Sequence, residues 1–147
     1  MKCIILAGGK GSRLSELTKS IPKPMVNING KPIILHIMRH YSKYGVKKFI
    51  IAAGYKSYVI KNYFKKKFYD WDIKIVDTGL NSMTGGRLKR LEKFFDKDET
   101  FMFTYGDGIS DVNIKKLLQF HRKSKKILTV TAVHPPARFG EIILNKN

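Results

Sequence analysis

Short apolar runs alternate along this chain with longer amphipathic stretches. The apolar runs are typical of buried strands, and they predict strands at residues 2–7, 48–53, 100–105, 127–133 and 141–144, with a short extended piece at 25–28. The alternating pattern of residues 72–77 predicts a further strand. Apolar residues at helical spacing predict helices from Pro32 to about Gly45, near 57–68, from Thr84 to about Phe95, and near 113–123. The Asn29-Gly30 pair indicates a turn between the first short piece and the first helix.

Repeated strand–helix–strand units are typical of a parallel sheet covered by helices. We therefore predict an α/β fold with a Rossmann-like, mostly parallel sheet and helices on both faces. No linker, internal repeat or low-complexity tract interrupts residues 1–147, so one domain is expected. Ligands of such folds bind outside the carboxyl ends of the strands, and each glycine-rich motif of this chain follows a predicted strand.

Composition narrows the class of protein. Hydrophobic residues at 43% and charged residues at 27% indicate a soluble globular protein, and no apolar run approaches the roughly 20 residues that cross a bilayer. The single cysteine, Cys3, cannot form an internal disulfide, which agrees with a reducing cytosol. A cytoplasmic protein without a membrane segment is expected. No catalytic triad and no zinc-ligand spacing is visible.

The net charge of +18 raises the question of a polyanionic partner. Residues 1–69 hold 15 of the 29 Lys and Arg residues but only one acidic residue, Glu16. Lysines dominate and are scattered, whereas proteins that read nucleic-acid bases usually cluster arginines and stacking aromatics on one face. Solvated lysine-rich faces together with a triphosphate substrate therefore explain the charge better than a nucleic acid does.

The strongest local motif is the glycine-rich segment from Leu6 to Leu14, Leu-Ala-Gly-Gly-Lys-Gly-Ser-Arg-Leu. Glycines directly after a strand let the backbone approach a ligand closely, and consecutive N–H groups can form an anion-binding nest. Lys10 and Arg13 would reinforce it. The spacing matches neither a P-loop nor the dinucleotide-binding fingerprint, and a tight strand-to-helix turn is the structural alternative.

Two further motifs supply single charges. In Pro22-Lys23-Pro24 the prolines restrict where the Lys23 ammonium points, which suits stabilisation of a phosphate in flight; a stiff surface turn is the alternative. In Tyr105-Gly106-Asp107-Gly108 a lone carboxylate follows a strand, where it can hold Mg²⁺ against a triphosphate. A turn or helix-capping aspartate is the alternative there.

A fourth motif begins the helix that follows the 72–77 strand. It reads Thr84-Gly85-Gly86-Arg87, and its glycines expose backbone N–H groups at a helix start. Arg87 on the first turn could reach a phosphate or a base edge.

Together these motifs, in this order, resemble the sugar-phosphate nucleotidyltransferase family. The glycine-rich loop, Pro22-Lys23-Pro24-Met25 and Gly30-Lys31-Pro32-Ile33 form a specific series. Gly54-Tyr55-Lys56, the 84–90 segment, Tyr105-Gly106-Asp107-Gly108 and Pro135-Pro136-x-Arg138-Phe139-Gly140 look most like its glucose-1-phosphate cytidylyltransferase branch.

The resemblance implies transfer of a cytidylyl group from CTP to glucose 1-phosphate with Mg²⁺, giving CDP-glucose and pyrophosphate. The alternatives are a nucleotidyltransferase that uses another base (UTP, GTP or dTTP) or another phosphorylated substrate, and a truncated, non-catalytic nucleotide-binding module. Assembly into a homo-oligomer is an open question at this point. By resemblance, Arg13 and Lys23 are catalytic and Asp107 is the metal ligand. The residues implied in nucleotide binding are Leu6, Ala7, Gly8, Gly9, Gly11, Ser12, Arg13, Lys23, Thr84, Gly86 and Arg87.

Three departures from the family pattern qualify this expectation. Ser12 replaces a usual threonine and keeps the hydroxyl. The segment between Phe68 and Asp77 is much shorter than cytidylyltransferases usually have, and the chain ends at Asn147, before the family's later lysine, most of its sugar contacts and its second metal-binding aspartate. A fragment, a truncated gene product and a degenerate relative are the explanations we consider, and each predicts weak CTP–Mg²⁺ binding with little turnover.

Overall fold

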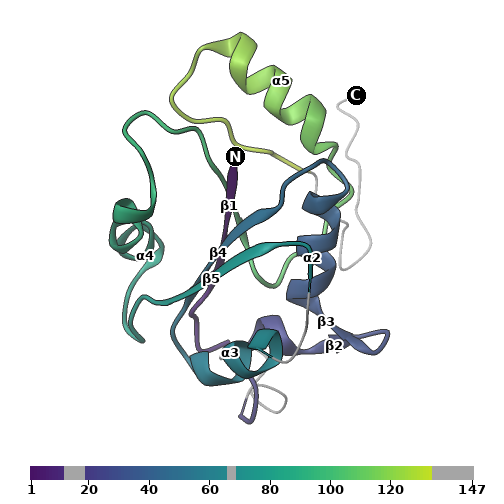
Figure 1. Ribbon diagram of the computed structural model, residues 1–147, viewed down its shortest axis with the longest axis vertical. Helices are drawn as coiled ribbons and strands as arrows, with labels where there is room; N and C mark the ends of the chain where they lie inside the picture. Colours follow the sequence, from purple (N-terminus) through teal and green to yellow (C-terminus); the bar gives the residue numbers. More distant parts are fainter. Residues whose placement is uncertain (12–18, 66–68, 134–147) are drawn as a thin grey trace, which may run out of the picture. The chain divides into compact units, whose positions relative to one another are not determined.

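The computed structural model describes residues 1–11, 19–65 and 69–133. Its contacts divide the chain into two compact units, Met1–Ile114 and Lys115–Asn147. The elements of the first unit are β1 (Lys2–Ala7), η2 (Lys23–Met25), β2 (Asn27–Ile28), β3 (Lys31–Pro32), α2 (Ile33–Ser42), β4 (Lys48–Ala53), α3 (Ser57–Lys65), β5 (Asp72–Asp77), α4 (Thr84–Arg90), η3 (Glu92–Phe94) and β6 (Met102–Tyr105) (Figure 1).

The central sheet has four parallel strands in the order β5-β4-β1-β6. From β1 the chain steps through β4 to β5 on one side and then returns to β6 on the other side, so the strand order reverses at β1. Such a reversal opens a crevice beyond the carboxyl ends of the two strands that flank it. The predicted α/β, Rossmann-like parallel sheet is confirmed.

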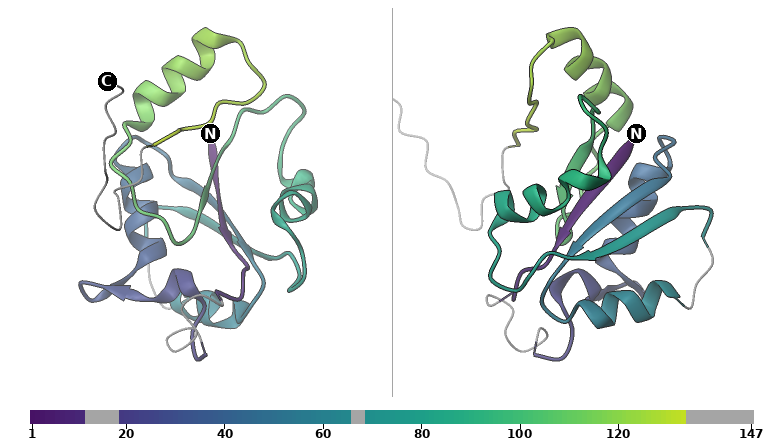
Figure 2. Two further views of the ribbon diagram at one scale, coloured as in Figure 1. Left: turned by 180° about the vertical axis from the view of Figure 1, so that it is seen from behind. Right: turned by 60° about the vertical axis from the view of Figure 1, so that its left-hand side comes forward.

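The two central strands are apolar on both faces because both faces are covered. One core contains Cys3, Ile5 and Ala7 of β1 with residues of α2 and α3, and the other contains Ile4 and Leu6 with Leu91 after α4. Burial on both faces explains why these strands read as continuous apolar runs rather than as an alternation. Figure 2 shows α4 on one side of the sheet and α2 and α3 on the other.

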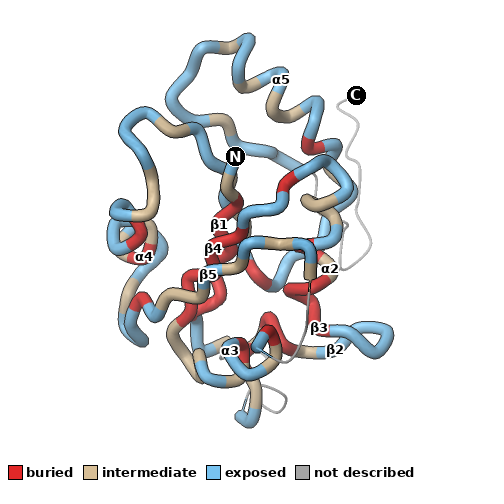
Figure 3. The backbone as a smooth tube through the Cα atoms, viewed as in Figure 1, coloured by how far each residue is buried: buried red, intermediate tan, exposed pale blue. Residues whose placement is uncertain are grey.

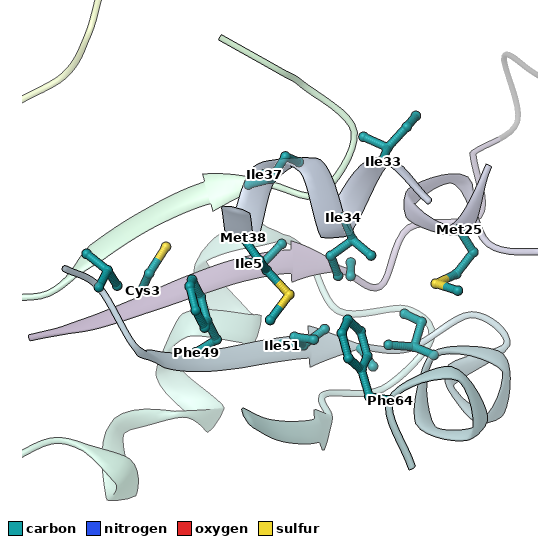
Figure 4. Close-up of a cluster of buried hydrophobic side chains, with 14 residues drawn as sticks. Cys3, Ile5, Met25, Ile33, Ile34, Ile37, Met38, Phe49, Ile51 and Phe64 are labelled. Carbon is teal, nitrogen blue, oxygen red and sulfur yellow. The ribbon is translucent and has the colours of Figure 1, made fainter. Parts of the chain in front are cut away.

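The deepest burial follows β1 and β4, which are red over most of their length in Figure 3. In the larger core, Phe49 and Ile51 of β4 lie beside Ile34 and Met38 of α2 (Figure 4). Burying each such side chain contributes roughly 1.5–3 kcal/mol, so this layer holds the strand ends in place.

Local signals set several boundaries as predicted. Asn29 and Gly30, with φ of 49° and 72°, form the turn of the β2–β3 hairpin, as expected of an Asn-Gly pair. Pro32 precedes α2 and Gly45, with a φ of 83°, follows it. The helix expected from Thr84 to Phe95 is shorter: α4 ends at Arg90, and a separate 3₁₀ turn, η3, follows the fully buried Leu91.

One predicted strand is wrong. Residues 127–133 form no strand, and Ile127, Leu128, Val130 and Val133 are exposed. Their β-branched composition favours a strand, but a strand also needs a neighbour to pair with, and none is present for this segment among the described residues. The strand expected at 141–144 lies outside the described residues.

The second unit is described from α5 (Ile114–Ser124), whose first residue belongs to the first unit, to residue 133. After α5, Lys125 turns the chain with a φ of 50°, and the His121 ring nitrogen Nδ1 lies 2.8 Å from the Thr129 hydroxyl. Among the described residues, no helix combines the length and the apolar character that a membrane crossing requires.

Candidate nucleotide site

The register of the sheet brings the glycine-rich motifs together. Ala7 pairs with Ala53, Ala53 pairs with Asp77, and Leu6 pairs with Tyr105, so the four strands end at one level. The next residues of each strand therefore meet at the same edge. The backbone N–H of Gly106 donates to the Leu6 carbonyl at 2.9 Å, which joins the motif after β6 to the start of the glycine loop.

A pocket lies at this edge, where the strand order reverses between β1 and β6. Nine of the predicted residues line it: Leu6, Ala7, Gly8, Gly9, Gly11, Lys23, Thr84, Arg87 and Asp107. Gly86 is not among its lining residues, and Ser12 and Arg13 lie outside the described residues. The pocket is also lined by Pro24, Ser82, Met83 and Tyr105, to which the sequence analysis gave no role in binding. Pro24, Met83 and Tyr105 directly adjoin a predicted residue or motif glycine, and Ser82 precedes Thr84 by two positions.

Lys23 and Asp107 form an ion pair although they are 84 residues apart. The Lys23 ammonium lies 2.6 Å from Oδ2 of Asp107, and the two side chains are 29% and 33% exposed. Lys23 begins the η2 turn after Pro22, and Pro24 is buried beneath it. The prolines thus hold the lysine at the mouth of the pocket, with its charge directed at the carboxylate.

Gly106 permits this arrangement. A Cβ at this position would lie 3.0 Å from the Leu6 carbonyl oxygen and 3.0 Å from Cγ of Pro24, closer than side chains normally pack. The strand end that carries Asp107 can therefore approach β1 and the Lys23 turn only because residue 106 lacks a side chain.

Arg87 is turned into the protein. It is 5% exposed, and its Nη1 donates to the Gly79 carbonyl at 2.7 Å and to the Thr78 hydroxyl at 2.8 Å. Its Nη2 donates to the Gly8 carbonyl at 2.9 Å. Burial lowers the pKa of the Arg87 guanidinium, and the nearby Asp77 carboxylate opposes that shift. These contacts are not visible in the sequence, from which Arg87 in the first turn of the helix was expected to reach a phosphate or a base edge.

Asp107 suits a metal ligand of the magnesium type. Mg²⁺ commonly binds one or two carboxylates and completes its shell with phosphate oxygens and water, so a single carboxylate is an adequate protein contribution where a phosphate ligand supplies further oxygens. Among the described residues no cluster of three or more His, Cys, Asp or Glu side chains could hold a metal alone. The donor set therefore fits a metal that arrives with a phosphate ligand.

Fold and pocket together define an α/β protein with a glycine-lined pocket at the switch point of a parallel sheet. The nucleotidyl transferase family model matches residues 2–147, and the chain belongs to this family.

Individual relatives agree with this assignment. The chain is 49% identical to glucose-1-phosphate cytidylyltransferase of Salmonella typhimurium over 164 residues, with 97% of this chain and 64% of the relative covered. It is 38% identical to D-glycero-alpha-D-manno-heptose 1-phosphate guanylyltransferase of Campylobacter jejuni over 142 residues, with 97% and 62% covered. The expected resemblance to the cytidylyltransferase branch is confirmed.

Among solved structures, HddC from Yersinia pseudotuberculosis complexed with GMP-PN matches with a TM-score of 0.69 and 31% identity, covering 82% of this chain and 53% of that one. Of the curated cytidylyltransferases that it matches, the chain spans about 64% of the length.

Proposed function

We propose that this chain carries the nucleotide-binding part of an enzyme that transfers a cytidylyl group from CTP to glucose 1-phosphate, giving CDP-glucose and pyrophosphate. The observation that carries the proposal is the Lys23–Asp107 pair beside the glycine loop, at the strand-order reversal. A cation for phosphate and a carboxylate for a metal stand there within one pocket. The identity to the Salmonella typhimurium cytidylyltransferase supports the choice of base and sugar.

In the proposed reaction a phosphate oxygen of glucose 1-phosphate attacks the α-phosphorus of CTP in line. One P–O bond forms, the bond from the α-phosphorus to the bridging oxygen breaks, and pyrophosphate leaves with that electron pair. No residue needs to become covalently modified, so the protein contributes position and charge.

Each part of the pocket has a role in this proposal. The backbone from Leu6 to Gly11 lies against the nucleotide and its phosphates, and Thr84, which lines the pocket at the start of α4, helps to hold the nucleotide. Lys23 stabilises the negative charge that develops on the phosphates, together with Arg13. Mg²⁺ bound to Asp107 would neutralise phosphate charge when present. A cytoplasmic site of action is part of the proposal, since the one cysteine, Cys3, is a buried free thiol.

One observation favours guanylyl transfer as a second candidate. The alignment to the Salmonella typhimurium enzyme is longer than this 147-residue chain, so that relative contains residues with no counterpart here. The alignment to the Campylobacter jejuni guanylyltransferase fits within the chain's own length. The guanylyltransferase thus aligns with this chain without the additional length that the cytidylyltransferase alignment contains.

Thermal unfolding of the chain with each of CTP, GTP, UTP and dTTP, with and without Mg²⁺, tests the proposal. A triphosphate at about tenfold above its Kd stabilises a protein by about 1.4 kcal/mol. For a chain of this size that stabilisation raises Tm by roughly 3–6 °C. We expect the largest rise with CTP and Mg²⁺, its loss in Lys23→Met, and its retention in Lys31→Met, which removes an exposed lysine of β3. A larger rise with GTP would establish the second candidate, and no rise with any triphosphate would contradict nucleotide binding.

A further inference from the structure

Arg87 joins the carboxyl ends of three strands. Its guanidinium donates to Gly8 after β1, to the Ala53 carbonyl at the end of β4 at 3.3 Å, and to Thr78 and Gly79 after β5. It also donates to the Leu80 carbonyl at 3.3 Å. Every one of these acceptors is a neutral carbonyl or hydroxyl oxygen. A planar guanidinium with a fixed fork of donors can hold several carbonyl groups in one arrangement, which a flexible lysine cannot do.

Two glycines leave the space that the guanidinium occupies. A Cβ built on Gly8 would overlap the guanidinium directly. A Cβ built on Gly54, after β4, would lie 2.8 Å from Nη1 of Arg87 and 2.8 Å from the Gly8 carbonyl oxygen. By contrast, a Cβ on Gly9 would meet no atom within 4 Å. Gly8 is thus required by the protein interior, whereas Gly9 borders open space on the pocket side.

The bond to Gly8 sets the direction of the next amide group. The Gly8 carbonyl accepts from Arg87 and also from the Tyr55 backbone N–H at 3.1 Å, so its oxygen is held inward by two donors. In a trans peptide the carbonyl and the following N–H lie in one plane and point in opposite directions. Holding the Gly8 oxygen inward therefore turns the Gly9 N–H outward, toward the pocket that both glycines line.

We propose that Arg87 is a positioning residue, which aims the Gly9 N–H at a phosphate of the bound nucleotide by holding the Gly8 carbonyl. This role rests on the proposed nucleotide binding and specifies how the glycine loop achieves it. Arg87 acts through the loop backbone, and direct contact with the ligand is not needed.

The unliganded protein provides the first test. The Gly9 amide resonance, assigned by NMR in the chain without nucleotide, should move in Arg87→Lys and Arg87→Ala, because the Gly8–Gly9 peptide loses its anchor. It should not move in Arg90→Ala, which removes an exposed arginine from the same helix. An unchanged chemical shift of the Gly9 amide in Arg87→Lys would overturn the proposal. If Arg87→Ala does not fold, the test rests on Arg87→Lys alone.

Nucleotide affinity provides the second test. Arg87→Lys should weaken CTP–Mg²⁺ binding by about tenfold, the loss typical of one hydrogen bond to a charged group, and Arg90→Ala should leave it nearly unchanged. Gly8→Ala should weaken binding in the parent chain and add little in Arg87→Ala, where the overlap is gone. If the losses of CTP affinity caused by Gly8→Ala and by Arg87→Ala were fully additive in the double variant, the proposed coupling between Gly8 and Arg87 would be contradicted. If the parent chain binds no triphosphate, the proposed function fails, while the amide measurement still reports on Arg87.

Discussion

Replacing Asp107 by Asn separates the two roles proposed for the Lys23–Asp107 pair, phosphate binding by Lys23 and metal binding by Asp107. In the unliganded protein the Asp107 carboxylate is paired with the Lys23 ammonium, which lies 2.6 Å from its Oδ2. An incoming phosphate must therefore compete with this carboxylate for Lys23. Asparagine keeps the size of the side chain but removes the charge, so it frees Lys23 and at the same time weakens the magnesium ligand. We therefore expect opposite effects on nucleotide binding without and with Mg²⁺.

The size of the effect follows from the exposure of the pair. Both side chains are about a third exposed, at 29% and 33%, so water screens much of their attraction. Pairs of this kind contribute about 0.2–1 kcal/mol, and we take the upper part of that range because the distance is short. Releasing Lys23 should then strengthen metal-free CTP binding by roughly two- to fivefold. The same loss should lower Tm by less than about 4 °C.

Calorimetric titration of CTP in EDTA and in excess Mg²⁺ measures both effects. The parent chain should bind more tightly with Mg²⁺ than without it, and Asp107→Asn should bind equally in both conditions. Asp111→Asn is the matched control, since Asp111 is an exposed carboxylate four residues further on and outside the pocket. Weaker binding of the Asp107 variant in EDTA would refute the competition for Lys23.

Two further predictions follow from the packing around the site and the core. Gly106→Ala places a Cβ 3.0 Å from the Leu6 carbonyl oxygen and 3.0 Å from Pro24, so the free energy of unfolding measured in urea should fall by about 1–3 kcal/mol. Gly108→Ala is the control: its Cβ meets no atom within 4 Å, so the free energy of unfolding should change by less than about 0.5 kcal/mol. A loss of equal size in both variants would contradict the close approach. Cys3 is fully buried and burial raises the pKa of its thiol, so alkylation of native protein at pH 8 should be far slower than in denaturant. Because the folded state favours the neutral thiol, stability should fall as pH rises above the unfolded pKa of about 8.5, and Cys3→Ala should remove that part of the fall.

Local pattern was sufficient to locate most elements of the first unit. The segments at 2–7, 48–53 and 72–77 are strands with the predicted bounds. The first two are apolar at successive positions because they are buried on both faces, and the third, the edge strand β5, is partly exposed and alternates. The Asn29-Gly30 turn was equally readable, since both residues tolerate the positive φ that the hairpin requires. Composition alone failed at 127–133, because a strand is stabilised by a neighbouring strand and not by its own side chains.

The sequence also determined which residues are brought to the candidate site. Motifs that follow parallel strands must lie at one edge of the sheet, so Gly8 and Asp107 could be grouped without coordinates. Lys23 follows no strand of the sheet and was grouped with them by the family resemblance alone. Only the tertiary structure decided how they interact. The 2.6 Å contact of Lys23 with Asp107 closes a loop of 84 residues, and the inward turn of Arg87 depends on the carbonyl groups of three strand ends. Such contacts arise from the sheet register, because side-chain direction is set by partners that are distant along the chain and near only in the fold.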